Sequence, residues 1–207
     1  AVWSGFRTFT VTRKVVEDGA ESVCSFYLEP DDRKALPPFL PGQFLTFRLD
    51  VPGATSDSQP LVRCYSLSDA PCPDHYRVSI KRVPAPAGTD HPAGRSSNFF
   101  HDHVEVGSRL QVRAPSGHFH LIEDGDLPIV LIAGGIGITP MLSILNALAH
   151  WADPREVWLF YGVRNGTEHA LAEVWYPVLG GLRGVGPDAL RAETEALAPT
   201  SNNAWRQ

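Results

Sequence analysis

The sequence predicts an antiparallel β-barrel followed by a partial parallel α/β unit. Up to about Glu123, short runs that favour β-strands are separated by Pro, Gly and Asp, a texture typical of all-β domains. From Leu127 onward the pattern lengthens into strand, helix and strand, which is typical of a parallel α/β unit. With 207 residues, 43% of them hydrophobic, the chain can bury the core of one large domain or two small ones.

Six strands are predicted in the first part of the chain. Alternation of apolar and polar residues in the fifth strand places Val78 and Ile80 on one face and Ser79 on the other. A stretch rich in Pro, Ala and Gly follows it and is predicted to be a loop, residues 83–94. We expect the strands at residues 6–16, 22–28, 43–49, 62–68, 76–83 and 109–114.

The second part is predicted to contain two parallel strands and several helices. Residues 127–132 lack polar alternation, as expected for a strand buried on both faces of a parallel sheet. Two strands leave open edges, so we expect an incomplete sheet that a partner chain could extend. The further expectations are a helix at 138–151, a strand at 156–161, a helix at 167–175, a glycine-rich loop at 180–186 and a helix at 187–198.

Composition excludes several classes of function. The net charge is −5 and the basic residues do not cluster, which argues against nucleic acid as a partner. No apolar run approaches the roughly 18 residues that cross a bilayer, which argues against a membrane protein. The cysteines are odd in number and lack metal-ligand spacing, which favours free thiols in a reducing cytoplasm; they are Cys24, Cys64 and Cys72.

The stretch Leu131-Ile-Ala-Gly-Gly-Ile-Gly-Ile-Thr-Pro140 predicts a phosphate-binding turn. An apolar strand runs into three glycines, whose small size lets the backbone approach a ligand. Thr139 and Pro140 then suit a helix start, where free amides bind an anion such as a dinucleotide pyrophosphate. The alternative is that the glycines only allow the strand and helix to pack closely, because the spacing departs from Gly-x-Gly-x-x-Gly. The glycines are Gly134, Gly135 and Gly137.

Two segments of the first part have the side chains that a flavin needs. Alternation in the fourth strand places Arg63, Tyr65 and Leu67 on one side and Ser66 on the other. Arginine offers a planar fork to phosphate, tyrosine a flat face to a ring, and serine a hydroxyl to a ring nitrogen. The segment 94–102 opens a short helix with small polar residues and is a second candidate anion site. The alternatives are an ordinary strand and a plain helix cap.

The order of these motifs resembles the ferredoxin-NADP reductase superfamily, and it is most similar to the reductase part of flavohaemoglobins and oxygenase reductases. The resemblance covers residues 6 to about 165. It implies an antiparallel Greek-key flavin-binding β-barrel, residues 1–124, and a partial parallel α/β nicotinamide-binding domain, residues 125–207. The motifs are Trp3-x-Gly-Phe-Arg, Pro41-Gly-Gln-Phe-Leu, Arg63-x-Tyr-Ser-Leu-Ser-Asp-Ala-Pro and Ser79-Ile-Lys-Arg.

The resemblance also implies a role for individual residues. Arg63 would hold a flavin phosphate, Tyr65 would pack on the isoalloxazine ring, and Ser66 would lie near the flavin N5, which makes Tyr65 and Ser66 the expected catalytic residues. The other implied contacts are Leu67, Ile80 and Lys81 around the flavin; Gly94, Ser96, Ser97 and Asn98 at its pyrophosphate; Gly134, Gly135, Gly137, Thr139 and Pro140 at the nicotinamide cofactor's pyrophosphate; and Arg164 at its adenosine half.

The implied activity is transfer of a hydride from NAD(P)H to FAD, followed by single electrons to a haem or iron-sulfur acceptor. FAD is favoured over FMN by the pyrophosphate pattern at 96–98, and the choice between NAD and NADP stays open. Family members continue for several more strands, so we expect tight flavin binding with weak or absent NAD(P)H oxidation. The alternatives are a non-catalytic flavin-binding or interaction module, a barrel without a ligand, and a metal site formed by two histidine pairs at strand spacing, His101 with His103 and His118 with His120.

Overall fold

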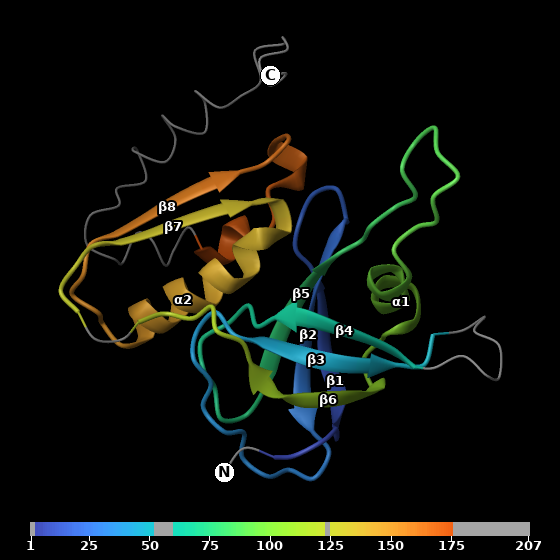
Figure 1. The fold of residues 1–207 in the computed structure, drawn as a ribbon, viewed down its shortest axis with the longest axis horizontal. Coiled ribbons are helices and arrows are strands. Elements are labelled where there is room, and N and C mark those ends of the chain that lie inside the picture. The colour runs from blue at the N-terminus through green and yellow to red at the C-terminus, as the bar shows by residue number, and fades with distance from the viewer. Residues whose placement is uncertain (1–2, 52–59, 123–124, 176–207) are drawn as a thin grey trace.

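The computed structural model describes residues 3–51, 60–122 and 125–175 and contains two sheets (Figure 1). A six-stranded antiparallel sheet has the order β4-β3-β6-β1-β2-β5, and a parallel pair joins β7 to β8. This arrangement confirms the predicted fold class. The strands are β1 (Arg7–Val16), β2 (Val23–Pro30), β3 (Phe44–Leu49), β4 (Leu61–Ser66), β5 (Tyr76–Lys81), β6 (Arg109–Ser116), β7 (Ile129–Gly134) and β8 (Val157–Gly162), and the helices are α1 (Arg95–His103), α2 (Ile138–His150) and the short 3₁₀ turns η1 (Gly135–Gly137) and η2 (Gly166–Glu168).

The antiparallel sheet curls until its two edge strands meet. Just beyond β4, Leu67 forms a bridge to Val78 of β5, and the Ser68 N–H donates to the Arg77 carbonyl over 2.9 Å. Strands β6, β3, β4 and β5 are therefore neighbours in that order, which is the Greek-key arrangement in which the fourth strand returns beside the first. The sheet strands lie within three residues of the ranges expected from sequence at every end.

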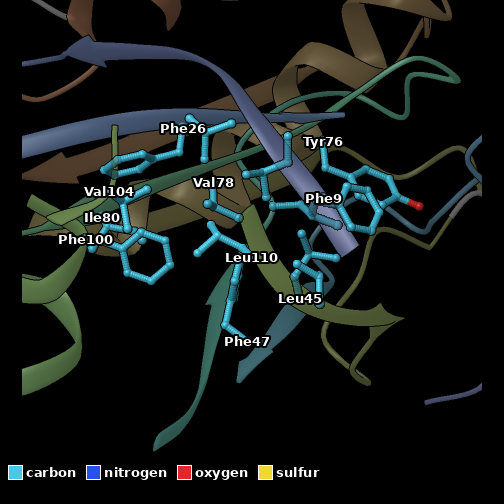
Figure 2. Packing of buried hydrophobic residues seen from close by; sticks show 14 of the residues in the cluster. Phe9, Phe26, Leu45, Phe47, Tyr76, Val78, Ile80, Phe100, Val104 and Leu110 are labelled. Atoms are coloured by element: carbon cyan, nitrogen blue, oxygen red, sulfur yellow. The ribbon is translucent and has the colours of Figure 1, made fainter. Parts of the chain in front are cut away.

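Aromatic rings and aliphatic side chains fill the interior of the antiparallel sheet (Figure 2). Phe100 of α1 is fully buried and lies edge-on to Phe26, Phe47 and Tyr65, each at a centroid distance of 5.3 Å. Edge-to-face pairs of this kind add to the stability that burial of the rings already supplies. Helix α1 is thus held against one end of the sheet, and one of the rings that hold it is Tyr65.

The parallel pair β7–β8 is covered on one face by α2. The buried leucines of α2 are Leu142, Leu145 and Leu148, and they pack on alternate residues of the two strands. The other face is apolar and exposed, with Ile132 71% and Trp158 42% accessible. The expectation of a strand buried on both faces is therefore wrong for the described residues, because α2 covers a single face. No helix in the described ranges is long and apolar enough to cross a membrane.

The segment after β8 differs from the predicted helix at 167–175. It forms η2 and then a turn, and only residues 172–175 are helical. Leu171 has φ of 60°, and its N–H donates over 2.9 Å to the carbonyl of Glu17, the residue that follows β1. A residue in the left-handed conformation interrupts an α-helix. The hydrogen bond to a distant segment therefore prevents the continuous helix that the local sequence pattern favours. The predicted loop at 180–186 and helix at 187–198 lie outside the described residues.

Gly94 and Gly137, the N-caps of α1 and α2, provide a matched test of packing. Both have φ close to −60°, but a Cβ on Gly94 would lie 2.8 Å from the Val83 Cβ, whereas one on Gly137 would find no atom within 4 Å. We expect Gly94→Ala to lower the free energy of unfolding by about 1–3 kcal/mol more than Gly137→Ala does. Urea unfolding measures the free energy of unfolding of both variants. Equal losses of stability would contradict the close packing of Gly94 against Val83 at the start of α1.

Candidate functional site

A cavity of about 620 Å³ lies where β4, β5 and the first turns of α1 and α2 converge. This volume is in the range of small-molecule sites. Residues from four separate stretches of sequence meet there, which local pattern alone does not show. The predicted site residues that line it are Arg63, Tyr65, Ser66, Ile80, Lys81, Gly94, Ser96, Ser97, Gly137, Thr139 and Pro140.

A second and larger cavity of about 1280 Å³ adjoins the first. The two share Lys81, Val83 and Ile136 as lining residues, so they are contiguous at that point. The predicted residues Gly135 and Arg164 line the larger cavity and not the smaller one. The smaller cavity therefore lies next to a space that borders the ends of β7 and β8.

Tyr65 borders the smaller cavity from β4. Its ring lies edge-on to Phe47 and Phe100, and its hydroxyl is 2.7 Å from the Ser96 Oγ of α1. Burial raises the pKa of the Tyr65 phenol, although the Ser96 hydrogen bond and the charge of Arg63 act the other way. The phenol is therefore neutral at neutral pH, with a fixed ring beside open space. That is the placement expected of a residue that packs on a flat ligand.

Two arginine side chains border the same cavity. The exposed Arg63 donates from Nη1 to the Val62 carbonyl over 2.8 Å, and within the described ranges no carboxylate pairs with it. Arg95, at the first position of α1, also lines the cavity and was not among the predicted residues. A guanidinium without a partner carboxylate beside a cavity is suited to bind phosphate oxygens.

The start of α1 presents donors to this cavity. Ser96 and Ser97 are each 7% exposed, and the first turn contains no acidic residue. Amides in the first turn of a helix have no partner within the helix and attract anions. Asn98 has a different place: its side-chain amide donates to the Val83 carbonyl over 3.2 Å, and the residue lines neither cavity.

The glycine turn between β7 and α2 faces open space. A Cβ added at any of its glycines would meet no atom within 4 Å, which contradicts the alternative that close packing requires them. Gly135 has φ of +50°, a conformation that side chains disfavour. The Thr139 hydroxyl donates to the Ile136 carbonyl over 3.0 Å and so secures the turn at the start of α2. The glycines of this turn are Gly134, which lines neither cavity, Gly135 and Gly137.

Leu67 is a further predicted residue that lies away from the site. It is fully buried in the core of the antiparallel sheet, and its N–H donates to the Gln43 carbonyl over 2.9 Å. Because β-strand side chains alternate, the residue after Ser66 points to the other face. The alternation in the sequence correctly places Leu67 in phase with Tyr65, but at this end of the strand that phase leads into the core.

Sequence reasoning did not find Ser79, Val83 and Glu168 as part of the site. Ser79 and Val83 line the smaller cavity, and alternation in β5 was a usable signal for Ser79. Glu168 forms an ion pair with Lys81 over 2.6 Å, and this pair lowers the pKa of the Glu168 carboxyl. The two residues are 87 positions apart, so no local pattern could reveal the contact.

The two histidine pairs do not form a metal site. His101 and His103 lie on α1 and not on a strand, so the first is buried and the second is exposed. The His101 Nε2 is 2.9 Å from the Ile80 carbonyl, and the His120 Nδ1 is 3.1 Å from the Leu121 carbonyl. Among the described residues, no three His, Cys, Asp or Glu side chains converge on one point.

Comparison with known proteins identifies the family. Residues 131–178 match the Oxidoreductase NAD-binding domain family. The solved flavohem-like FAD/NAD-binding domain of nitric oxide dioxygenase from Vibrio cholerae O1 biovar El Tor is 35% identical, with a TM-score of 0.76 over 85% of this chain and 70% of that one. The chain belongs to the ferredoxin-NADP reductase-like family.

Other members of this reductase family are longer than the chain. The flavohemoprotein of Bacillus cereus is 43% identical over 171 residues, which are 83% of this chain and 40% of that protein. A flavohemoglobin from Malassezia yamatoensis, solved with bound FAD and heme, is 26% identical with a TM-score of 0.69, over 86% of this chain and 43% of that one. The chain thus spans about 40% of the length of the flavohemoproteins it matches and corresponds to their reductase part.

His101 makes the stability of the folded chain sensitive to acid. Burial lowers the pKa of His101, and the neutral ring donates from Nε2 to the Ile80 carbonyl at the cavity. In the unfolded chain, His101 has a pKa of about 6.5 and takes up a proton below that pH, whereas the folded chain binds this proton only at lower pH. The free energy of unfolding therefore decreases as the pH falls from about 6.5 through the lower pKa of the folded state. We expect His101→Gln, which keeps a donor, to reduce this loss between pH 6.5 and 5.

Urea unfolding across this pH range measures the effect. The matched control is His103→Gln, two positions along α1 and exposed. It should keep the pH dependence of the original protein, and a His101→Gln slope equal to the original would refute the assignment.

Proposed function

We propose that this chain is an FAD-dependent NAD(P)H oxidoreductase that passes a hydride from NAD(P)H to FAD and then single electrons to a haem or iron-sulfur acceptor. The observation that carries this proposal is the pair of contiguous cavities, one bordered by Tyr65 and the other by the glycine turn. Two cofactors that exchange a hydride must bind in direct contact. The acceptor would be another domain or protein, as the haem of the related flavohemoglobin suggests.

The residues around the smaller cavity fit FAD. Tyr65 offers a fixed aromatic ring, and Ser66 offers a hydroxyl at the same cavity. Arg63 and the first turn of α1 with Ser96 and Ser97 form two separate groups of phosphate donors. Two phosphate-binding groups favour a diphosphate, so FAD fits better than FMN.

The glycine turn fits the pyrophosphate of NAD(P)H. Open space around Gly135 and Gly137 lets a ligand reach the first amides of α2. Gly135 lines the larger cavity, and Gly137, Thr139 and Pro140 line the adjoining side of the smaller one, so the turn lies where the two cavities meet. Arg164 lines the larger cavity beyond β8, where it would lie near the adenosine half. On this assignment residues 1–124 form the FAD-binding domain and residues 125–207 belong to the NAD(P)-binding domain.

When bound, the two cofactors supply the redox chemistry, with the hydride passing between nicotinamide and flavin. The chain's own residues bind and orient. The Tyr65 ring, braced by Phe47 and Phe100, would fix the plane of the flavin, and the Ser66 hydroxyl would offer it a hydrogen bond. No side chain has to act as a general acid or base, so the contribution of the protein is alignment and exclusion of water.

The three free thiols, Cys24, Cys64 and Cys72, support a cytoplasmic location, because unpaired cysteines persist in reducing compartments. A non-catalytic flavin-binding or interaction module is the second candidate function. It is favoured by the exposed apolar face of β7–β8, which includes Ile132 and Trp158. In that case a partner would complete the open edge of the parallel pair, and bound flavin would not be reduced by NAD(P)H.

Anaerobic reduction of bound flavin tests the proposal. The purified protein should bind FAD tightly, and excess NADH or NADPH should bleach the flavin absorption slowly in a stopped-flow trace, because weak NAD(P)H oxidation is expected of this chain. Bound flavin that neither nucleotide reduces would favour the module, and protein that does not bind FAD would refute both.

Arg63→Ala should weaken FAD binding about tenfold or more, as loss of a charge-assisted hydrogen bond to phosphate predicts. Arg48→Ala is the matched control, because Arg48 is an exposed arginine on the neighbouring strand β3 and lines neither cavity. Fluorescence titration with FAD measures both affinities. An Arg63→Ala affinity equal to that of the control would contradict the phosphate role.

A further inference from the structure

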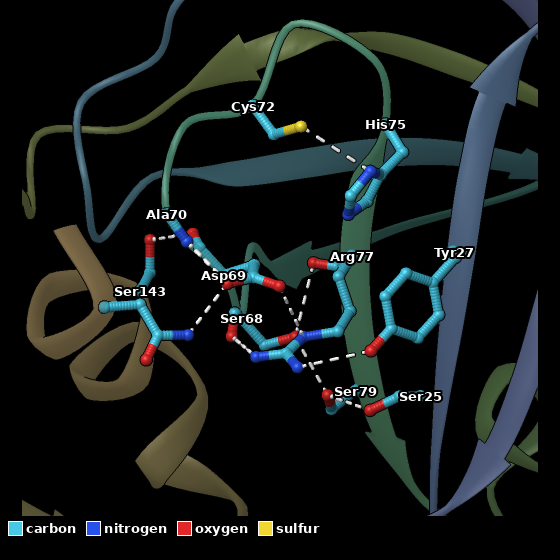
Figure 3. Close-up of polar contacts among 11 residues, drawn as sticks. Ser25, Tyr27, Ser68, Asp69, Ala70, Cys72, His75, Arg77, Ser79 and Ser143 are labelled. Carbon is cyan, nitrogen blue, oxygen red and sulfur yellow. Dashed lines mark hydrogen bonds and ion pairs between the residues drawn. The ribbon is translucent and has the colours of Figure 1, made fainter. Parts of the chain in front are cut away.

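A buried arginine clamps the loop that follows β4. Arg77 of β5 has only 3% of its side chain exposed. Its Nη2 donates to the Ser68 carbonyl, its Nη1 lies 3.4 Å from the Tyr27 hydroxyl, and its Nε lies 3.5 Å from the Asp69 Oδ2 (Figure 3). A buried guanidinium has to keep its partners, so Ser68 and Asp69 are held in one place.

Helix α2 docks on this clamped loop. The Ser143 hydroxyl donates to the Asp69 carbonyl over 2.7 Å, and the Asn146 side-chain amide donates to the Asp69 Oδ1 over 2.8 Å. Figure 3 shows Asp69 between Ser143 of the helix and Arg77 of the strand. Ser143 is fully buried, so its hydroxyl has no water to replace this partner.

The same face of α2 reaches the cavity one turn earlier. Thr139, Ser143 and Asn146 are spaced four and three residues apart, which places them on one side of the helix. Thr139 lines the smaller cavity, and the glycine turn immediately precedes it. On the sheet side, Asp69 is three residues after Ser66, and Arg77 is two residues before Ser79, both of which line the cavity. The hydrogen bonds to Asp69 therefore connect the two walls of the site.

We propose that Asp69, clamped by Arg77, is a positioning residue whose hydrogen bonds to Ser143 and Asn146 set where the glycine turn stands relative to the FAD side of the cavity. The inference rests on the proposed function for its catalytic consequence, though not for its geometry. Asp69 lines neither cavity and so acts through α2. The polar junction of Asp69, Arg77, Ser143 and Asn146 would keep the nicotinamide-binding turn at a fixed distance and orientation from the flavin-binding wall of the cavity.

The double variant Ser143→Ala with Asn146→Ala removes both hydrogen bonds from the helix side and leaves every cavity residue in place. We expect the limiting rate of FAD reduction by NADH to fall about tenfold, because small misplacements of reacting groups are costly. The FAD affinity and the NADH concentration at half-maximal rate should change less than about threefold. Thr10→Ala is the control, since it removes a 2.6 Å hydrogen bond to Asp31 within the antiparallel sheet.

Rescue separates positioning from loss of stability. Asn146→Asp alone would place a second carboxylate against that of Asp69 and lower the limiting rate below that of the original protein. Asn146→Asp combined with Asp69→Asn restores one hydrogen-bond donor and one acceptor at this contact. We expect the combined variant to recover at least half of the lost rate on a logarithmic scale. A double variant with an unchanged limiting rate, or a combined variant no faster than Asn146→Asp, would overturn the proposal.

A distance measurement tests the geometry without any cofactor. Genetically encoded spin labels at Val16 and His150, exposed residues on β1 and at the end of α2, report the separation of sheet and helix. The double variant should give a broader or shifted distance distribution than the original protein and the Thr10→Ala control, and identical distributions would overturn the inference. If NADH fails to reduce FAD bound to the original protein, the proposed function is wrong. The distance measurement still shows whether the polar junction positions α2.

Discussion

Strand β5 is the element on which both cavities depend, because it carries polar side chains through the interior and each has to be paired. Five of its six residues are buried. Arg77 is held by the loop after β4, Ser79 lies 2.6 Å from Ser25 and 2.8 Å from Ser68 through its Oγ, and Lys81 is paired with Glu168. Leaving the buried charge of Arg77 without its partners costs about 3–5 kcal/mol. These pairs therefore constrain the neighbours of β5 as strongly as the packing does.

The pairs made by β5 lead in different directions and enclose the site. The Ile80 carbonyl accepts a hydrogen bond from His101 and so holds α1. The Arg77 side chain secures the loop on which α2 docks. Lys81 reaches the segment after β8. The smaller cavity is the space left between these attached elements. A flat, charged ligand suits it because aromatic carbon lies on one side and helix N-termini lie on others.

The parallel pair contrasts with this well-connected sheet. Its buried face rests on α2, and its other face exposes apolar residues, with Val130 57% and Phe160 42% accessible. Two strands with one covered face gain little from burial on their own. The position of β7 and β8 therefore depends on α2 and on the segment at 166–175, and both are fastened to the antiparallel sheet by the hydrogen bonds of Asp69, Glu17 and Lys81.

The sequence by itself determined the element types, the fold class and most of the residues that border the smaller cavity, because alternation, glycine turns and helix starts are local signals. The sequence could not show that Leu67 lies in the core, that the expected helix is interrupted at Leu171, or that His101 bonds to the Ile80 carbonyl. Those outcomes depend on partners that are distant in the chain. Only the tertiary structure decided that Arg77, Asp69 and Asn146 join the two walls of the site, since a buried charge takes whichever partner the fold brings within reach.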